Sequence, residues 1–194
     1  MSTKEHWDAI FDKGQKFTTL KDEDLDAVLE RVGNAKTALD VACGTGGLLV
    51  QLAQRGLVVT GMDVSSVALS KAHEALRSAG VDAMLIEADF NTPDFTHKIT
   101  EPYDIVFIRL AFAFVQDRDV FLEAIKKCMV PEGAFICSSP GLLPGVEYDV
   151  RQNNISLLKD ELEQTLHRHF KSVELIPGDI SAGPNWPILT YLCR

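Results

Sequence analysis

A glycine-rich turn follows an apolar, strand-like run that contains one acidic residue. Residues 38–48 are Ala-Leu-Asp-Val-Ala-Cys-Gly-Thr-Gly-Gly-Leu, and the acid is Asp40. Glycine lets the backbone turn tightly and approach a ligand, while the helix predicted after the turn offers unpaired N–H groups and the positive end of its dipole. These residue types in this order predict a binding site for a nucleotide-like cofactor.

Two further carboxylates stand at the ends of the next two strand-like runs. Asp63 follows residues 57–62, and Asp89 follows residues 83–87. If the three strands are neighbours in a parallel sheet, their ends lie about 4.8 Å apart and the three acids span roughly 10 Å, comparable to an adenosine. Asp63 also follows Gly46 by 17 positions, about where an acidic side chain can accept both hydroxyls of a ribose.

Each carboxylate also has a purely structural interpretation. Asp63 can cap a helix that begins near Ser65, Asp40 can brace the glycine turn alone, and Asp89 can be a solvated turn residue. A carboxylate inside an apolar strand needs hydrogen-bond partners to offset its desolvation, so Asp40 is the hardest of the three to explain structurally.

The elements that position these residues alternate along the chain. Apolar residues at helical spacing predict helices at residues 22–32, 47–55, 66–79, 119–129 and 155–170. Runs rich in β-branched and aromatic residues predict strands near residues 37–42, 57–62, 83–87, 103–108, 134–137, 172–176 and 187–192. The alternation predicts a parallel sheet with right-handed crossovers, and the short loop between the last two strands predicts an antiparallel pair.

Composition restricts the class of protein. The 194 residues, 46% of them apolar, suit one domain, expected as an N-terminal helical cap (1–35) and a core (36–194). A formal charge of −9 without a basic stripe disfavours nucleic acid as a partner. Without a long apolar run or the apolar core of a signal peptide, a cytoplasmic protein with no membrane association is expected. The four cysteines, at positions 43, 128, 137 and 193, stand far apart in the sequence and form no CxxC pair. We therefore expect reduced cysteines that pack in the interior, and neither a metal site nor a disulfide.

Taken together, the motifs resemble those of the class I S-adenosylmethionine-dependent methyltransferases over nearly the whole chain. Residues 40–46 are similar to their glycine-rich first motif, residues 61–65 to the acidic end of their second strand, and residues 88–90 to their adenine-binding segment. Their fourth strand and the turn before the fifth match residues 103–106 and 131–133. The opening run His6 to Phe11 further resembles small-molecule members of the tellurite-resistance and thiopurine type, whose N-terminal segment helps to cover the cofactor.

The resemblance implies a Rossmann-like α/β fold with a seven-stranded, mostly parallel sheet of order 3-2-1-4-5-7-6, strand seven antiparallel, and helices on both faces. It also implies S-adenosyl-L-methionine as cofactor, with Asp40 and the turn at the methionine moiety, Asp63 at the ribose hydroxyls and Asp89 at the adenine amino group. The implied cofactor-binding residues are Asp40, Ala42, Cys43, Gly44, Thr45, Gly46, Met62, Asp63, Val64, Ala88, Asp89, Phe90 and Arg109. Ala42 stands where the family usually has its first glycine, which is tolerable if φ is negative there.

The expected reaction is methyl transfer to a small-molecule acceptor by in-line displacement, with little covalent help from the protein. Candidates for contact with the acceptor or for proton transfer are Arg109, Tyr148 and His6, while His73, His167 and His169 are expected to be solvated. A pocket wall is expected from the loop 138–154. An apolar wall is also indicated by Phe90, Phe112, Phe114, Leu142 and Leu143, although aromatic residues at such positions are more often core.

Two rival interpretations stay open. An NAD-type Rossmann enzyme is disfavoured because Leu49 occupies the place of the third glycine counted from Gly44, and because Asp40 has no role there. A non-catalytic, cofactor-binding module is compatible with the lack of an obvious catalytic base.

Overall fold

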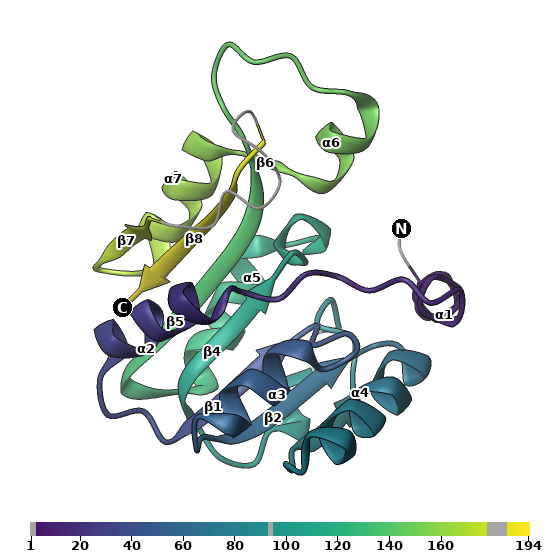
Figure 1. Ribbon diagram of the computed structural model, residues 1–194. Helices are drawn as coiled ribbons and strands as arrows, with labels where there is room; N and C mark the ends of the chain where they lie inside the picture. Colours follow the sequence, from purple (N-terminus) through teal and green to yellow (C-terminus); the bar gives the residue numbers. More distant parts are fainter. Residues whose placement is uncertain (1–2, 93–94, 178–185) are drawn as a thin grey trace.

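The computed structural model describes residues 3–92, 95–177 and 186–194, which form a central β-sheet between two layers of helices (Figure 1). The strands are β1 (Thr37–Val41), β2 (Val58–Asp63), β3 (Met84–Glu87), β4 (Tyr103–Arg109), β5 (Met129–Leu142), β6 (Leu157–Leu158), β7 (Val173–Ile176) and β8 (Ile188–Cys193). The helices are α1 (Lys4–Asp12), α2 (Asp22–Val32), α3 (Gly47–Gln54), α4 (Ser66–Ala79), α5 (Arg118–Lys127), α6 (Val150–Ile155) and α7 (Lys159–His169), with short 3-10 helices η1 (Phe95–Lys98) and η2 (Phe112–Phe114).

The sheet has the strand order β3-β2-β1-β4-β5-β8-β7, and the short β6 pairs with β5. Strand β8 runs antiparallel to both β5 and β7, whereas the pairs among β1 to β5 are parallel. Leaving β6 aside, this is the expected order with the expected antiparallel strand, so the fold class is confirmed. Within the described residues the sheet has eight strands rather than the expected seven. The additional strand, β6, has only two residues, too few to show a period that could be recognised in the sequence.

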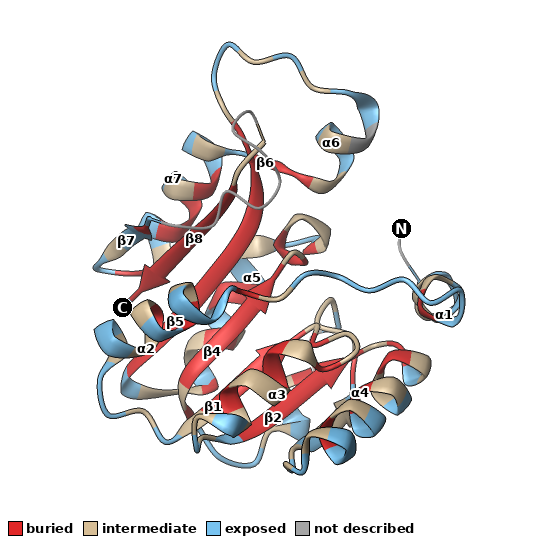
Figure 2. Cartoon of the chain, in the orientation of Figure 1, coloured by how far each residue is buried: buried red, intermediate tan, exposed pale blue. Residues whose placement is uncertain are grey.

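Alternate residues of the strands face two separate cores. On β4, Ile105 and Phe107 pack with the core under α2, α3 and α4, whereas Val106 and Ile108 pack with the core under α5 and α7. Successive side chains of a strand point to opposite faces, which makes the central strands apolar on both sides. In Figure 2 the central strands are buried and the helices expose their outer faces.

Two predictions between β5 and β7 are wrong in detail. The helix expected at 155–170 is instead α6, β6 and then α7, which begins at Lys159. Asp149 and Gln152 form a capping box that starts α6, and the residue after α6 is extended, so the helical pattern is interrupted by local capping. The loop expected at 138–154 likewise contains the end of β5 and most of α6.

Strand β5 is longer than the sequence predicts. Expected at residues 134–137, it includes the segment 131–133, which was expected to be a turn, and its register with β4 shifts between Tyr103 and Ile105. Its last ten residues are buried. A strand covered on both faces shows no alternation of apolar and polar residues, so its ends are hard to recognise in the sequence.

The N-terminal residues form α1, a connecting segment and α2. We call residues 13–21 the strap, because it crosses the carboxyl edge of the sheet from α1 to α2 (Figure 1). Helix α1 lies against α4. Within the described parts of the chain, no helix is both long enough and apolar enough to cross a bilayer.

Candidate functional site

Three charged residues from three neighbouring strands line one cavity. Strand β1 pairs Asp40 with Gly61 of β2 and with Phe107 of β4. Asp63 and Arg109 each lie two residues beyond these partners, so the three side chains point to the same face of the sheet. That face carries α3, and all three residues line a cavity at the carboxyl end of the strands.

Asp40 is a buried carboxyl group, only 3% exposed. Its burial raises the pKa from 3.8 to about 8, and the nearby Asp63 adds to this rise while Arg109 opposes it. A carboxyl group with this pKa keeps its proton near neutral pH unless a further positive charge comes close. A cationic group beside Asp40 would lower this pKa and stabilise the charged form of the carboxyl group.

Asp63 joins the glycine turn to the start of α4. Its two carboxylate oxygens accept hydrogen bonds from the backbone N–H groups of Gly44 and Ser65, each at 2.9 Å. Burial raises the pKa of Asp63, and these backbone hydrogen bonds oppose the rise. Ser65 in turn caps α4 and donates its hydroxyl to Asp8 of α1 at 2.6 Å. The helix cap considered for Asp63 is therefore provided by Ser65, and Asp63 instead ties that residue to the glycine turn. A carboxylate has about four acceptor positions, so Asp63 keeps acceptor capacity for a ligand.

The glycine turn is left-handed at Ala42, Gly44 and Gly46, with φ values of 61°, 54° and 79°. The condition named for an alanine at this position, a negative φ, is therefore not met. Alanine adopts the left-handed conformation at a cost of about 1–2 kcal/mol. At Gly46 a Cβ would lie 2.8 Å from the Cβ of Ala72, so the missing side chain lets α3 approach α4.

A second cavity adjoins the first near the ends of β2 and β3. It shares Trp7, Val64, Phe90 and Phe114 with the first cavity and is also lined by Asp89. The carboxylate oxygen Oδ1 of Asp89 accepts a hydrogen bond of 2.9 Å from the backbone N–H of Asn91. The turn role considered for Asp89 is present, and the same residue faces a cavity.

An aromatic cluster covers the first cavity from the N-terminal side. We call Trp7, Phe11, Phe17 and Phe114 the aromatic roof. Trp7 is its centre, with ring centroids 5.2 Å from Phe114, 6.1 Å from Phe11 and 6.3 Å from Phe17. Phe114 was expected at the pocket, and Trp7 and Phe11 lie in the N-terminal run that the resemblance places over the cofactor. Phe17 was not expected there, because it lies in the strap, where no periodic pattern marks it.

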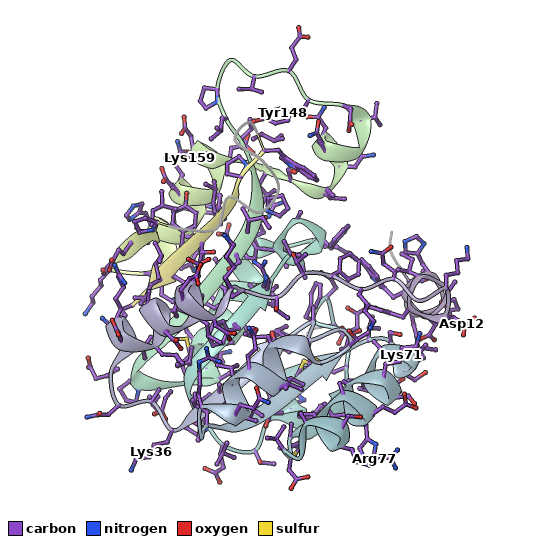
Figure 3. All side chains as sticks on the ribbon, in the orientation of Figure 1. Asp12, Lys36, Lys71, Arg77, Tyr148 and Lys159 are labelled. Carbon is purple, nitrogen blue, oxygen red and sulfur yellow. The ribbon has the colours of Figure 1, made fainter. Side chains whose placement is uncertain are left out.

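Polar contacts hold α1 and the strap over the cavity. Arg109 donates from Nε to the carbonyl of Thr18 at 3.1 Å and from Nη2 to the carbonyl of Thr19 at 3.0 Å. Lys71 of α4, labelled beside α1 in Figure 3, donates to the carbonyl of Phe11. Arg109 therefore links the strap to the end of β4, where it lines the cavity.

Most of the implied cofactor residues meet at these two cavities. Those lining the first cavity are Asp40, Ala42, Cys43, Gly44, Thr45, Asp63, Val64, Phe90 and Arg109. Met62 and Ala88 are buried in the core instead. His6 is exposed on α1, and Tyr148 lies beside α6 (Figure 3), where its hydroxyl accepts a 2.8 Å hydrogen bond from the N–H of Leu143. Neither is among the described residues that line the cavities.

Other expectations concerned the pocket wall, the histidines and the cysteines. The expected wall residues Phe112 and Leu142 are buried and are not among the described lining residues. The expectation that His169 is solvated is wrong, since its side chain is 9% exposed and its ring nitrogens lie 2.7 Å from Asp119 and 3.0 Å from Glu123. Packing of α7 on α5 brings these carboxylates to it. The four cysteines are free and buried.

Residues 38–133 match a family model described as a methyltransferase domain. A carboxy-S-adenosyl-L-methionine synthase of Nitratiruptor sp. is 28% identical over 58% of this chain and 47% of its own length. A ubiquinone biosynthesis O-methyltransferase of Pseudomonas savastanoi pv. phaseolicola is 32% identical over 57% and 47%, respectively. The chain spans about half the length of the curated relatives it matches.

A tRNA 5-carboxymethoxyuridine methyltransferase of Escherichia coli is 26% identical over 62% of this chain and 47% of its own length. The expectation that nucleic acid is not a partner is therefore left without support from relatives.

Solved structures share the whole fold. TehB from Haemophilus influenzae aligns with a TM-score of 0.65 and 16% identity, over 97% of this chain and 66% of that chain. The N-terminal domain of EvdMO1, solved with SAH bound, aligns with a TM-score of 0.71 and 16% identity, over 91% of this chain and 82% of that chain. At such identities the likeness establishes the fold.

Proposed function

We propose that this chain, a member of the methyltransferase domain family by the match of residues 38–133, is an active enzyme. It transfers a methyl group from S-adenosylmethionine to a small-molecule acceptor. The observation that carries this proposal is the meeting of Asp40, Asp63 and the glycine turn in one covered cavity. The raised pKa of Asp40 means that its ionised form is unfavourable in the cavity without a ligand. A cationic ligand beside this carboxylate would stabilise the ionised form.

The donor set of the two cavities fits this cofactor along its length. Asp40 and the turn at residues 43–46 would hold the methionine moiety, which carries an ammonium group and the sulfonium centre. Asp63 has lone pairs left for the ribose hydroxyls, and Asp89 lines the adjoining cavity where the adenine amino group would lie. The apolar contacts to the adenine ring would come from Val64 and Phe90.

When bound, S-adenosylmethionine supplies an electrophilic methyl group that a nucleophilic atom of the acceptor displaces in line. The residues of this chain contribute binding, orientation and the exclusion of water. The aromatic roof covers the cavity, and Arg109 fixes the strap beside it. A general base is required only for an acceptor that arrives protonated.

A small-molecule acceptor is favoured over nucleic acid by two features. The formal charge is −9, whereas affinity for nucleic acid comes largely from clustered cations. The described lining of the first cavity is also mostly apolar, with Arg109 as its cation.

The test is transfer of an isotopically labelled methyl group from S-adenosylmethionine to a panel of thiols, amines, phenols and carboxylates. We expect label in at least one acceptor, with S-adenosylhomocysteine formed in equal amount, and loss of both products in Asp63→Ala. Binding of the cofactor without transfer to any member of the panel would favour the non-catalytic module instead.

A further inference from the structure

Leu110, the residue after β4, has a backbone conformation that leucine rarely adopts. Its φ is 58°, in the left-handed region that disfavours side chains with a Cβ. Among the described residues, Ala42 is the other non-glycine residue with a positive φ. Both line the first cavity, so the backbone strain of this fold is concentrated at one site.

The two strained residues differ in their packing. Ala42 packs against the core cluster under α5 and α7. Leu110 belongs to neither of the two core clusters that the described residues form, and its side chain is only partly buried. An unfavourable conformation without compensating core contacts is typical of residues held in place for function.

The left-handed conformation changes what the end of β4 presents to the cavity. In a regular strand successive side chains point to opposite faces, yet Arg109, Leu110 and Ala111 all line the cavity. The N–H of Leu110 donates to the carbonyl of Ser138 on β5 at 2.7 Å, which fixes the residue to the sheet. The turn therefore places an apolar residue with a fixed backbone beside Arg109 at the cavity.

We propose that Leu110 determines acceptor specificity by packing against an apolar body, aromatic or aliphatic, of the molecule that receives the methyl group. This inference rests on the proposed function. Asp40, Asp63 and the glycine turn are assigned there to the cofactor, and Arg109 at the end of β4 is expected both at the cofactor and at the acceptor. Leu110, the next residue, has no role in that assignment. Phe17 and Phe114 of the aromatic roof line the same cavity and extend the apolar surface.

The experiment compares the wild type with Leu110→Ala and Leu110→Gly. Both remove the apolar side chain, and only Leu110→Gly also relieves the backbone. Leu175→Ala is the matched control, because Leu175 is an exposed leucine on the edge strand β7. The probe is 4-nitrophenol, an aromatic molecule, titrated into protein saturated with S-adenosylhomocysteine and, in parallel, into protein alone.

We expect the wild type and Leu175→Ala to bind 4-nitrophenol equally, and both Leu110 variants to bind it roughly fivefold to tenfold more weakly. S-adenosylhomocysteine should bind all four proteins within about twofold of one another, as expected for a side chain outside the cofactor site. Leu110→Gly should melt about 2–4 °C above Leu110→Ala, which shows that the strain belongs to the backbone position.

The inference is overturned if the Leu110 variants bind 4-nitrophenol as well as the wild type, or if the wild type does not bind it. Failure of the proposed function looks different. It appears as a lack of S-adenosylhomocysteine binding, and the titrations into protein alone then still decide whether Leu110 forms an apolar binding surface.

Discussion

The two ends of the parallel sheet use aspartate in opposite ways. At the amino end, near Lys36 at the lower edge of Figure 3, Asp104 accepts hydrogen bonds from the N–H of Lys36 at 2.7 Å and from the N–H and hydroxyl of Thr37 at 2.9 and 3.1 Å. These bonds, the one from Lys36 foremost, lower the pKa of Asp104. At the carboxyl end, burial raises the pKa of Asp40 to about 8.

We propose that the opposite pKa shifts distinguish an aspartate that stabilises the fold from one that serves a ligand. Asp104 is ionised and well paired, so its charge stabilises the folded chain. Asp40 is held where ionisation is unfavourable, and it gains a favourable environment only when a cation binds beside it. If this distinction is correct, substitutions at the two ends should change stability and ligand affinity in opposite ways.

The largest effect is expected at the carboxyl end. Asp63→Ala removes the proposed acceptor for the ribose hydroxyls and releases the N–H groups of Gly44 and Ser65. We expect the affinity for S-adenosylhomocysteine to fall about 100-fold or more, which corresponds to about 2.7 kcal/mol. Calorimetry measures this directly. Asp104→Ala is the control at the other end, and an equal loss of affinity there would abolish the distinction.

A second substitution should separate stability from binding. Asp40→Asn removes a buried group that is unfavourable when charged, so we expect the ligand-free protein to gain about 2 kcal/mol, or roughly 4–8 °C in melting temperature near pH 8. The same variant should bind S-adenosylmethionine at least tenfold more weakly, because the cation loses its partner. A variant that is less stable and binds normally would refute the assignment of Asp40.

The pH dependence of that gain follows from the raised pKa of Asp40. The folded chain holds the proton up to about pH 8, whereas the unfolded chain releases it near 3.8. The stability that this group contributes is therefore complete below pH 4 and is lost as the pH rises to 8. Thermal unfolding between pH 5.5 and 8.5 should show the gap between Asp40→Asn and the wild type widening with pH, and a constant gap would contradict it.

At the amino end of the sheet, we expect substitution of an aspartate to lower stability and to leave ligand affinity unchanged. Asp104→Asn keeps the size of the side chain but weakens three hydrogen bonds, so we expect a loss of about 1–2 kcal/mol in the free energy of unfolding at pH 7. Because the pKa of Asp104 is lowered, this loss should disappear as the pH falls below its ordinary value of 3.8. S-adenosylhomocysteine affinity should stay within about twofold of the wild type, and urea unfolding with parallel titrations tests both statements.

The smallest effect is expected at the glycine turn. Ala42→Gly places glycine at a φ of 61°, and we expect a gain of about 1 kcal/mol in the free energy of unfolding. Urea unfolding measures it. Since the turn keeps its conformation, S-adenosylhomocysteine affinity should not fall. A loss of stability would show that the alanine methyl group contributes more through the core than its backbone conformation costs.

The sequence predicts well what local pattern encodes. Helix α2 has the predicted bounds Asp22–Val32, and the three acids at the ends of β1, β2 and β3 lie in the expected order across the sheet. Periodic apolar residues and turn glycines carry this information within short windows. The parity of strand positions then brings Asp40 and Asp63 to one face.

What the sequence does not reveal depends on contacts between distant segments. The strap contacts Arg109 through the backbone carbonyl groups of Thr18 and Thr19. Every residue has such a carbonyl group, so the residue types do not indicate the contact. The positive φ of Ala42 and Leu110 is equally hidden, because both residue types ordinarily avoid it. The lining of the cavity at the strap and at the end of β4 is therefore harder to predict than its lining at the glycine turn.

The central claim is that the carboxyl end of this sheet binds S-adenosylmethionine through Asp63 and its neighbours. Calorimetric titration of the wild-type chain with S-adenosylhomocysteine and, separately, with NADH tests it most directly. We predict saturable binding of S-adenosylhomocysteine at one site per chain, reduced at least 100-fold in Asp63→Ala, and no binding of NADH. Binding of NADH alone would contradict the account and favour a dinucleotide-binding enzyme.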